Sequence, residues 1–174
     1  MLRRRDIVMF EMIEFDKGDP LRIQHLIKTR EIARLIAVGE KVPPDTKKII
    51  EVAAILHNIG IHPSEEKYGD CTGKHQEQLG PIYARALLNK LAFFPDDFVD
   101  RVCYLIAHHH TFNNIEGIDY QILVEADFIV NAYEDRLYIE KPDIIRNFRK
   151  NVFKTKTGIK LLENFFGDIL KEAD

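Results

Sequence analysis

The chain has 174 residues, the length of a single domain that buries about 70% of its unfolded surface. Its residues are 45% hydrophobic and 30% charged, with a net charge of -3, so composition gives no reason to expect a nucleic acid or an anionic membrane as partner. Acidic residues interrupt the apolar N-terminal stretch, so we expect neither a signal peptide nor a membrane span. Cys71 and Cys103 form no CxxC pair, which indicates reduced thiols in a cytoplasmic protein, with a disulfide as the less favoured alternative.

Apolar residues recur at helical spacing along the chain, whereas the alternation typical of strands never persists. Asp19-Pro20 and Pro43-Pro44 are typical helix starts, and Gly39 is a typical helix end. The predicted helices cover residues 2–14, 21–38, 44–57, 74–91, 95–110, 119–138, 142–154 and 158–171. The sequence therefore predicts an all-α, bundle-like single domain over residues 1–174. Its last two helices, within 142–171, should pack on the body through Phe148, Phe153, Phe165 and Phe166.

Two connections between these helices stand out. Residues 59–74 are expected to have no regular structure, and a loop of that length in a compact domain usually has a binding role. Residues 111–118 form a second loop. We expect the two loops to set substrate preference, although neither contains a motif that identifies the substrate.

The stretch 50–60 is predicted to be a central helix that ends in two polar residues. Its residues from 50 to 56 are nearly all apolar, which is typical of a helix buried on every side. His57 and Asn58 follow, and Gly60 breaks the helix. An unsatisfied polar group at such a place costs about 1–3 kcal/mol, so the pair needs partners. Backbone groups or a metal ion would both satisfy it.

Helical phase sorts the three consecutive histidines at 108–110. His109 and His110 continue two adjoining apolar faces of the helix before them, so both should point inward. His108 continues a more polar side and should face solvent. His25 and His75 lie near the starts of their own helices, where a lone histidine is more often a core or cap residue than a ligand.

Asp127 lies in the apolar segment ILVEADFIV, where an unpaired charge would be very costly. A buried salt bridge, a hydrogen-bonded carboxylate and a metal ligand are the alternatives, while Glu125 should lie on another side of the helix and be solvated. Imidazole and carboxylate together suit first-row divalent metals such as Mn, Fe, Co, Ni or Zn. The pattern as a whole therefore predicts a metal site.

The order His, His-Asn, His, His-His, Asp on successive helices resembles the HD-domain superfamily of metal-dependent phosphohydrolases. The resemblance lies in HLIKTREIARLIA, AAILHNIG, GKHQEQLGPIYARALL, CYLIAHHH and EADFIV, and it covers residues 20–135 or so. It implies an all-α core in which one metal is held by His25, His57, Asn58 and Asp127. It implies further that a second metal, where present, is held by His75, His109 and His110. In members with one metal, the same histidines lie nearer the substrate phosphate and take part in proton transfer. For members that have a single histidine where this chain has His109 and His110, His110 is the favoured match.

Asn58 departs from this pattern, because the family has an aspartate there. An amide oxygen can coordinate a metal but has no charge, so metal affinity should fall and a second ion becomes less favoured. The leading hypothesis is hydrolysis of a nucleotide or another small phosphate ester with one or two ions, with His75, His110 and Asp127 as catalytic residues. Weaker candidates are Lys67, Lys74 and Arg30 for phosphate and Glu77 for orienting a ligand.

Two other functions remain open from the sequence. Some members of the superfamily use a di-iron site for oxygenation, which the number of histidines permits and the loss of the aspartate disfavours. A domain that binds a metal or nucleotide without turnover is the third hypothesis, and Asn58 is its main support. Oligomeric state is not predicted.

Overall fold

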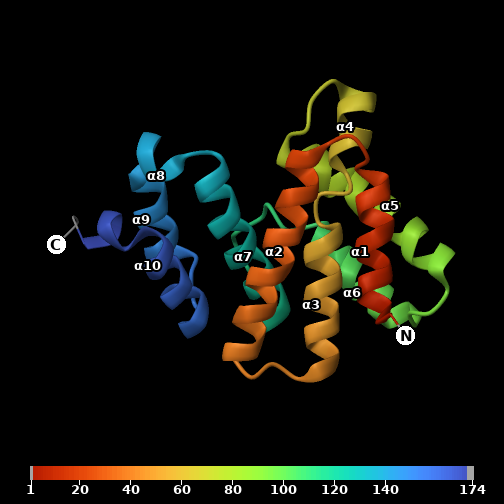
Figure 1. Cartoon of the computed structure of the whole chain (residues 1–174), viewed down its shortest axis with the longest axis horizontal. Coiled ribbons are helices and arrows are strands. Elements are labelled where there is room, and N and C mark those ends of the chain that lie inside the picture. The colour runs from red at the N-terminus through yellow and green to blue at the C-terminus, as the bar shows by residue number, and fades with distance from the viewer. Residues whose placement is uncertain (1, 172–174) are drawn as a thin grey trace.

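The computed structural model describes residues 2–171, in which helices joined by turns and loops are the regular structure and there is no strand. The helices are α1 (Arg4–Phe15), α2 (Pro20–Gly39), α3 (Pro44–Leu56), α4 (Ile61–Tyr68), α5 (Gly73–Leu91), α6 (Asp96–Ile106), α7 (Ile118–Glu134), α8 (Leu137–Glu140), α9 (Pro142–Asn151) and α10 (Lys156–Lys171) (Figure 1). The predicted all-α class is confirmed. Among the described residues, no helix is both long and apolar enough to cross a bilayer.

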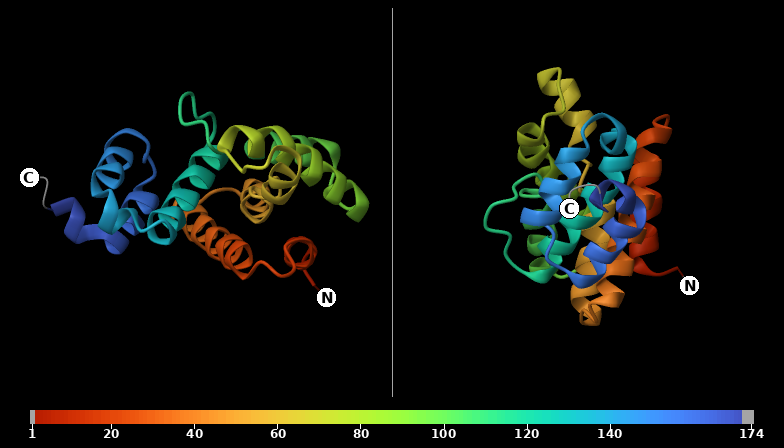
Figure 2. Two further views of the ribbon diagram at one scale, coloured as in Figure 1. Left: turned by 90° about the horizontal axis from the view of Figure 1, so that it is seen from above. Right: turned by 90° about the vertical axis from the view of Figure 1, so that its left-hand side faces the viewer.

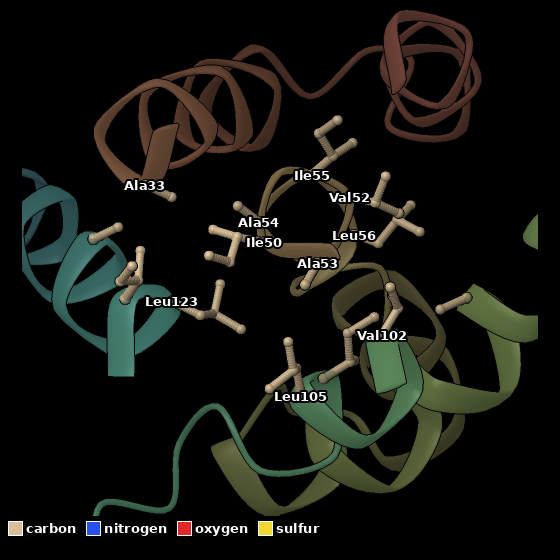
Figure 3. Packing of buried hydrophobic residues seen from close by; sticks show 14 of the residues in the cluster. Ala33, Ile50, Val52, Ala53, Ala54, Ile55, Leu56, Val102, Leu105 and Leu123 are labelled. Atoms are coloured by element: carbon tan, nitrogen blue, oxygen red, sulfur yellow. The ribbon is translucent and has the colours of Figure 1, made fainter. Parts of the chain in front are cut away.

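Helix α3 is the centre of the fold. Every residue from Ile50 to Leu56 is buried, and the neighbouring helices α1, α2, α6 and α7 surround them (Figure 3). One hydrophobic cluster joins α3 to these helices, which is the arrangement expected for a helix that is apolar on all sides. Because α3 runs through the core, its C-terminal end places His57 in the interior, where it is 0% exposed.

The C-terminal helices α8, α9 and α10 lie to one side of the molecule, beyond α7 (Figures 1 and 2). A second hydrophobic cluster joins them to Phe128 and Ile129 of α7, and it includes Phe153 and Phe166. Phe148 stacks on Phe128 with ring centroids 3.8 Å apart. The prediction of packing through phenylalanines is therefore correct for these rings. The prediction is wrong for the fourth phenylalanine, Phe165, which is 53% exposed.

The structure differs from the prediction in an additional helix and in where several helices end. Residues 59–74 contain α4, whose Pro63 lies in the first turn, where proline is tolerated, and whose end is capped by Gly69 at a φ of 75°. Helix α7 ends at Glu134, because Arg136 takes a left-handed conformation with φ 56°. Helix α6 ends at Ile106, so the three histidines follow it as a turn. The sequence did not predict these features, because a short polar helix or a single left-handed residue hardly changes the spacing of apolar residues.

Glu125 was predicted to be solvated, and this is wrong. Its carboxylate is 0% exposed and accepts hydrogen bonds from the backbone N–H groups of Lys154 and Thr155, at 2.6 and 3.0 Å. It also accepts from the Thr155 hydroxyl and from Gln121 Nε2. The two backbone N–H groups lie just before α10, where N–H groups lack helical partners. Glu125 therefore ties the start of α10 to α7.

We expect Gly158→Ala to destabilise the fold by about 1–3 kcal/mol, the usual cost of overpacking. A Cβ at this position would overlap the Glu125 carboxylate and crowd Thr155 Oγ1. Within a helix the same change normally stabilises by up to about 1 kcal/mol, so the sign of the effect is diagnostic. Urea unfolding measures it, and Gly167→Ala in α10 is the control, because a Cβ there meets nothing within 4 Å. Equal effects of the two substitutions would contradict the role of Glu125.

Candidate metal centre

Three side chains from three parts of the chain meet in the interior: His25 of α2, His57 just after α3 and Asp127 of α7. His25 Nε2 lies 3.0 Å from His57 Nε2 and 3.1 Å from Asp127 Oδ1, and His57 Nε2 lies 3.2 Å from Asp127 Oδ1. All three residues are buried. Among the His, Cys, Asp and Glu side chains of the described residues, these three form the cluster that can hold a metal ion.

The local structure at the end of α3 explains the orientation of His57. Carbonyl groups in the last turn of a helix have no partner within it, so they can accept from a nearby side chain. His57 Nδ1 donates to the carbonyl oxygen of Ala54 at 2.8 Å. The Nε2 atom is then a bare acceptor, and it faces His25 and Asp127.

His25 has the same tautomer for a different reason. Its Nδ1 atom donates to Glu134 Oε2 at 2.7 Å, so Nε2 is directed inward, where buried Thr29 lies 3.4 Å away through Oγ1. When both imidazoles are neutral, their two Nε2 lone pairs and a carboxylate oxygen thus converge on one point. Ligands about 2.1 Å from a shared ion lie about 3.0–3.4 Å apart, which agrees with the observed spacing. The three residues therefore fit a divalent transition metal.

The charges of the group are coupled. Burial lowers the pKa of His25, but hydrogen bonds to Asp127 and Glu134 outweigh this and raise the pKa to about 9. Burial raises the pKa of Asp127, but its contacts with His57 and His25 outweigh this and hold that pKa well below its usual range. Without metal, a proton on His25 therefore occupies the place of the cation.

We expect the metal-free protein to lose stability as the pH rises. His25 has a higher pKa folded (about 9) than its ordinary 6.5, so its contribution is complete below about pH 6.5 and disappears as the pH rises through 9. At about 1.4 kcal/mol per pKa unit, the loss is at most about 3.5 kcal/mol. Urea unfolding across this range measures it, and His25→Gln should lack this part of the slope. Identical slopes would contradict the assignment. Metal affinity should rise over the same range, because the metal must displace the proton.

His109 lies against this group. It is 0% exposed, and its ring centroid is 5.3 Å from that of His57. Its Nδ1 atom donates to the carbonyl of Ile106 at 2.7 Å, and its Nε2 atom is buried with no hydrogen-bond partner in the described part of the chain. Burial and the neighbouring His110 and His57 hold the pKa of His109 well below its usual range, so the ring is neutral. A bare, buried acceptor of this kind is suited to a metal or to a polar ligand.

His110 is the next ring along, with its centroid 4.0 Å from that of His109. Its Nε2 atom lies 3.3 Å from Gln76 Oε1, and its backbone N–H donates to Glu77 Oε1 at 3.0 Å. Burial lowers the pKa of His110. Glu77 thus orients the backbone of this turn rather than an imidazole, and Gln76 engages the nitrogen that a metal would otherwise use. His110 faces inward as expected, but a metal-binding role for it stays a prediction.

His75 lies outside the three-residue group. Its Nδ1 atom is 2.6 Å from Asp70 Oδ1, and its ring stacks on Tyr68 with centroids 4.0 Å apart. The side chain is 25% exposed, so it can meet a ligand arriving from solvent. Its roles in metal binding and catalysis stay predictions.

Asn58 follows His57 in the turn that leads into α4 and is half-buried. Its backbone carbonyl accepts from the N–H of Ile61, while its side-chain amide makes no hydrogen bond to another described residue. The amide is therefore available to a ligand, and it brings no charge.

The weaker phosphate candidates have other partners. Arg30 donates to Glu51 and Asp6 at 2.9 and 3.2 Å, so it belongs to a part-buried ion-pair network, and its role as a phosphate ligand stays a prediction. The Lys67 ammonium lies over the Tyr68 ring. Lys74 is exposed at the start of α5, and His108 is half-buried with Nδ1 donating to the carbonyl of Tyr104.

Sequence reasoning missed Glu134, the acceptor behind His25. One signal was available: Glu134 follows Asp127 by seven residues, two helical turns, and so lies on the same face of α7. Gln76 was missed as well, and a buried glutamine between His75 and Glu77 gave no comparable signal.

The fold and the site together define an all-α protein with a buried His-His-Asp group suited to a divalent cation. The sequence model of the HD domain family matches residues 22–148, which is most of the chain. The chain therefore belongs to the HD domain family, and the predicted resemblance is confirmed.

A solved structure supports this assignment. The chain is similar to a crystal structure from an uncultured Thermotogales bacterium, described as a predicted HD superfamily hydrolase. The sequences are 27% identical, the TM-score is 0.65, and the match covers 98% of this chain and 88% of the other. A comparison with curated proteins finds no match.

Proposed function

We propose that this protein is a metal-dependent hydrolase of phosphate esters, with a nucleotide or another small phosphorylated molecule as substrate. The observation that supports it most is the convergence of three buried acceptor atoms, His25 Nε2, His57 Nε2 and Asp127 Oδ1, all 3.0–3.2 Å apart. Membership of the HD domain family and the similarity to a predicted HD superfamily hydrolase support hydrolysis as the reaction.

His25, His57 and Asp127 would hold the ion, and the Asn58 amide oxygen is the available fourth ligand from the chain. A divalent cation bound there lowers the pKa of a coordinated water and polarises a phosphoryl oxygen. One ion is favoured over two, because Asp127 is the single carboxylate in the group and no anionic oxygen at position 58 bridges a second ion.

The remaining histidines would act on the substrate. His109, neutral and with a bare Nε2 atom, can accept a hydrogen bond from the attacking water or bind a second ion. His110 and His75 are the candidates for contacting phosphate and transferring a proton to the leaving group, His75 from its exposed position beside Tyr68. Both roles are proposals that activity measurements must test.

The test begins with metal-stripped protein reloaded with Mn, Fe, Co, Ni or Zn. Elemental analysis should find about one ion per chain. We expect at least one phosphate ester, among p-nitrophenyl phosphate, bis-p-nitrophenyl phosphate and nucleoside monophosphates, to be hydrolysed in a reaction that a chelator stops. No bound metal would refute the proposal, and so would bound metal without hydrolysis in both the wild type and Asn58→Asp.

Two other outcomes would identify a different function. Oxygen consumption by the iron-loaded protein, without hydrolysis, would indicate the di-iron oxygenase alternative. Hydrolysis by Asn58→Asp but not by the wild type would indicate a binding domain that has lost turnover, which the uncharged Asn58 side chain favours.

A further inference from the structure

The Nδ1 atoms of three inward histidines are held in two different ways. His57 and His109 follow the ends of α3 and α6, and each donates to a carbonyl of its own preceding turn, Ala54 at 2.8 Å and Ile106 at 2.7 Å. His25 lies inside α2, where the helix's own hydrogen bonds occupy the carbonyl groups. Its Nδ1 atom therefore needs an acceptor from another element.

Glu134, the last residue of α7, supplies that acceptor. Its Oε2 atom lies 2.7 Å from His25 Nδ1, and its Oε1 atom lies 2.6 Å from the ammonium of Lys28. Lys28 is three residues after His25 on α2, so both carboxylate oxygens are bound by the same helix. The Glu134 side chain is 25% exposed, which limits competition from water. Its orientation is thus determined by two partners at once.

We propose that Glu134 is a positioning residue of the metal centre. Through the Nδ1 hydrogen bond it holds His25 with the Nε2 lone pair directed at His57 and Asp127. An anionic acceptor on Nδ1 also increases the electron density at Nε2 and so strengthens it as a ligand. Glu134 thereby supplies part of the negative charge that the uncharged Asn58 side chain does not provide. This inference rests on the proposed function.

Lys28 has a secondary part in this arrangement. It holds the Oε1 atom of Glu134 but does not contact the inward side of His25. Replacing it with methionine leaves the carboxylate next to His25 and lets it rotate. We therefore expect Lys28→Met to change metal affinity by less than about 3-fold, whereas the loss of the Glu134 charge should cost about 10- to 100-fold.

The experiment is calorimetric titration of metal-stripped protein with Mn or Zn. Glu134→Gln keeps the size of the side chain and removes its charge, and Glu140→Gln is the matched control, because Glu140 is an exposed carboxylate six residues further along. Melting curves verify that each variant folds. We expect Glu134→Gln to bind metal about 10-fold or more weakly and Glu140→Gln to bind as the wild type does.

A second measurement does not depend on any variant. Long-range 1H–15N spectra of the zinc-loaded wild type should show His25 protonated at Nδ1 and metal-bound at Nε2. The opposite tautomer would overturn the proposal, as would wild-type affinity in Glu134→Gln or equal weakening in Glu140→Gln. If the wild type binds no metal at all, the proposed function fails and this inference fails with it, whereas any of the preceding results leaves the function standing.

Discussion

Asp127→Asn is expected to abolish metal binding, lowering affinity by at least about 100-fold, and to abolish any metal-dependent hydrolysis. Replacing a group that only supports a ligand typically costs 10- to 100-fold, and Asp127 provides the one anionic oxygen that faces both His25 Nε2 and His57 Nε2. The change keeps the size of the side chain, so cavity formation does not confound the result. Calorimetric titration and elemental analysis measure it.

The control for this substitution is Asp135→Asn. Asp135 is an exposed aspartate directly after α7, so this variant removes the same charge outside the group. It should bind metal with wild-type affinity. If Asp127→Asn retained its metal while binding elsewhere was excluded by anomalous diffraction, the ion would be held without Asp127 and the site as described would be wrong.

Asn58→Asp is expected to have the opposite effect, raising metal affinity by about 10-fold or more and increasing metal-dependent turnover. The substitution adds a unit negative charge beside His57, in a half-buried turn where electrostatic interactions are stronger than in water. The added carboxylate is partly desolvated in this half-buried turn, so we expect the variant to be less stable than the wild type when it is stripped of metal. Titration and urea unfolding with and without metal measure the two effects.

Asn58→Ala separates the contribution of the amide oxygen from that of the missing charge. If Asn58 already coordinates through its oxygen, the alanine variant should bind metal more weakly than the wild type. If the alanine variant and Asn58→Asp both bind as the wild type does, position 58 lies outside the coordination sphere. That result would leave a centre of His25, His57 and Asp127 alone.

Much of the fold could be read from local pattern. The run of apolar residues at 50–56 required a helix buried on all sides, and the polar pair that follows required partners in the interior. The helical phase of Asp127 and His109 indicated that they point inward, and both are buried. These properties depend on residues within a few turns of one another, so the sequence displays them directly.

Other features could not be read in this way. Glu125 looked solvated on its own helix, and it is buried because the start of α10 brings unpaired N–H groups to it from thirty residues further along. Arg30 was a weak candidate for phosphate, and the sequence did not show that α1 and α3 bring Asp6 and Glu51 to it. In both cases the partner comes from a distant segment.

The sequence by itself determined the helical class, the central helix and the inward direction of His109, His110 and Asp127, because these follow from periodicity and from the cost of burying a lone polar group. Tertiary structure alone decided that His25, His57 and Asp127 share one point, and that Glu134 lies behind His25. The physical reason is that a helix specifies which of its faces is apolar, whereas the packing of several helices decides which polar atoms on those faces come within hydrogen-bond distance.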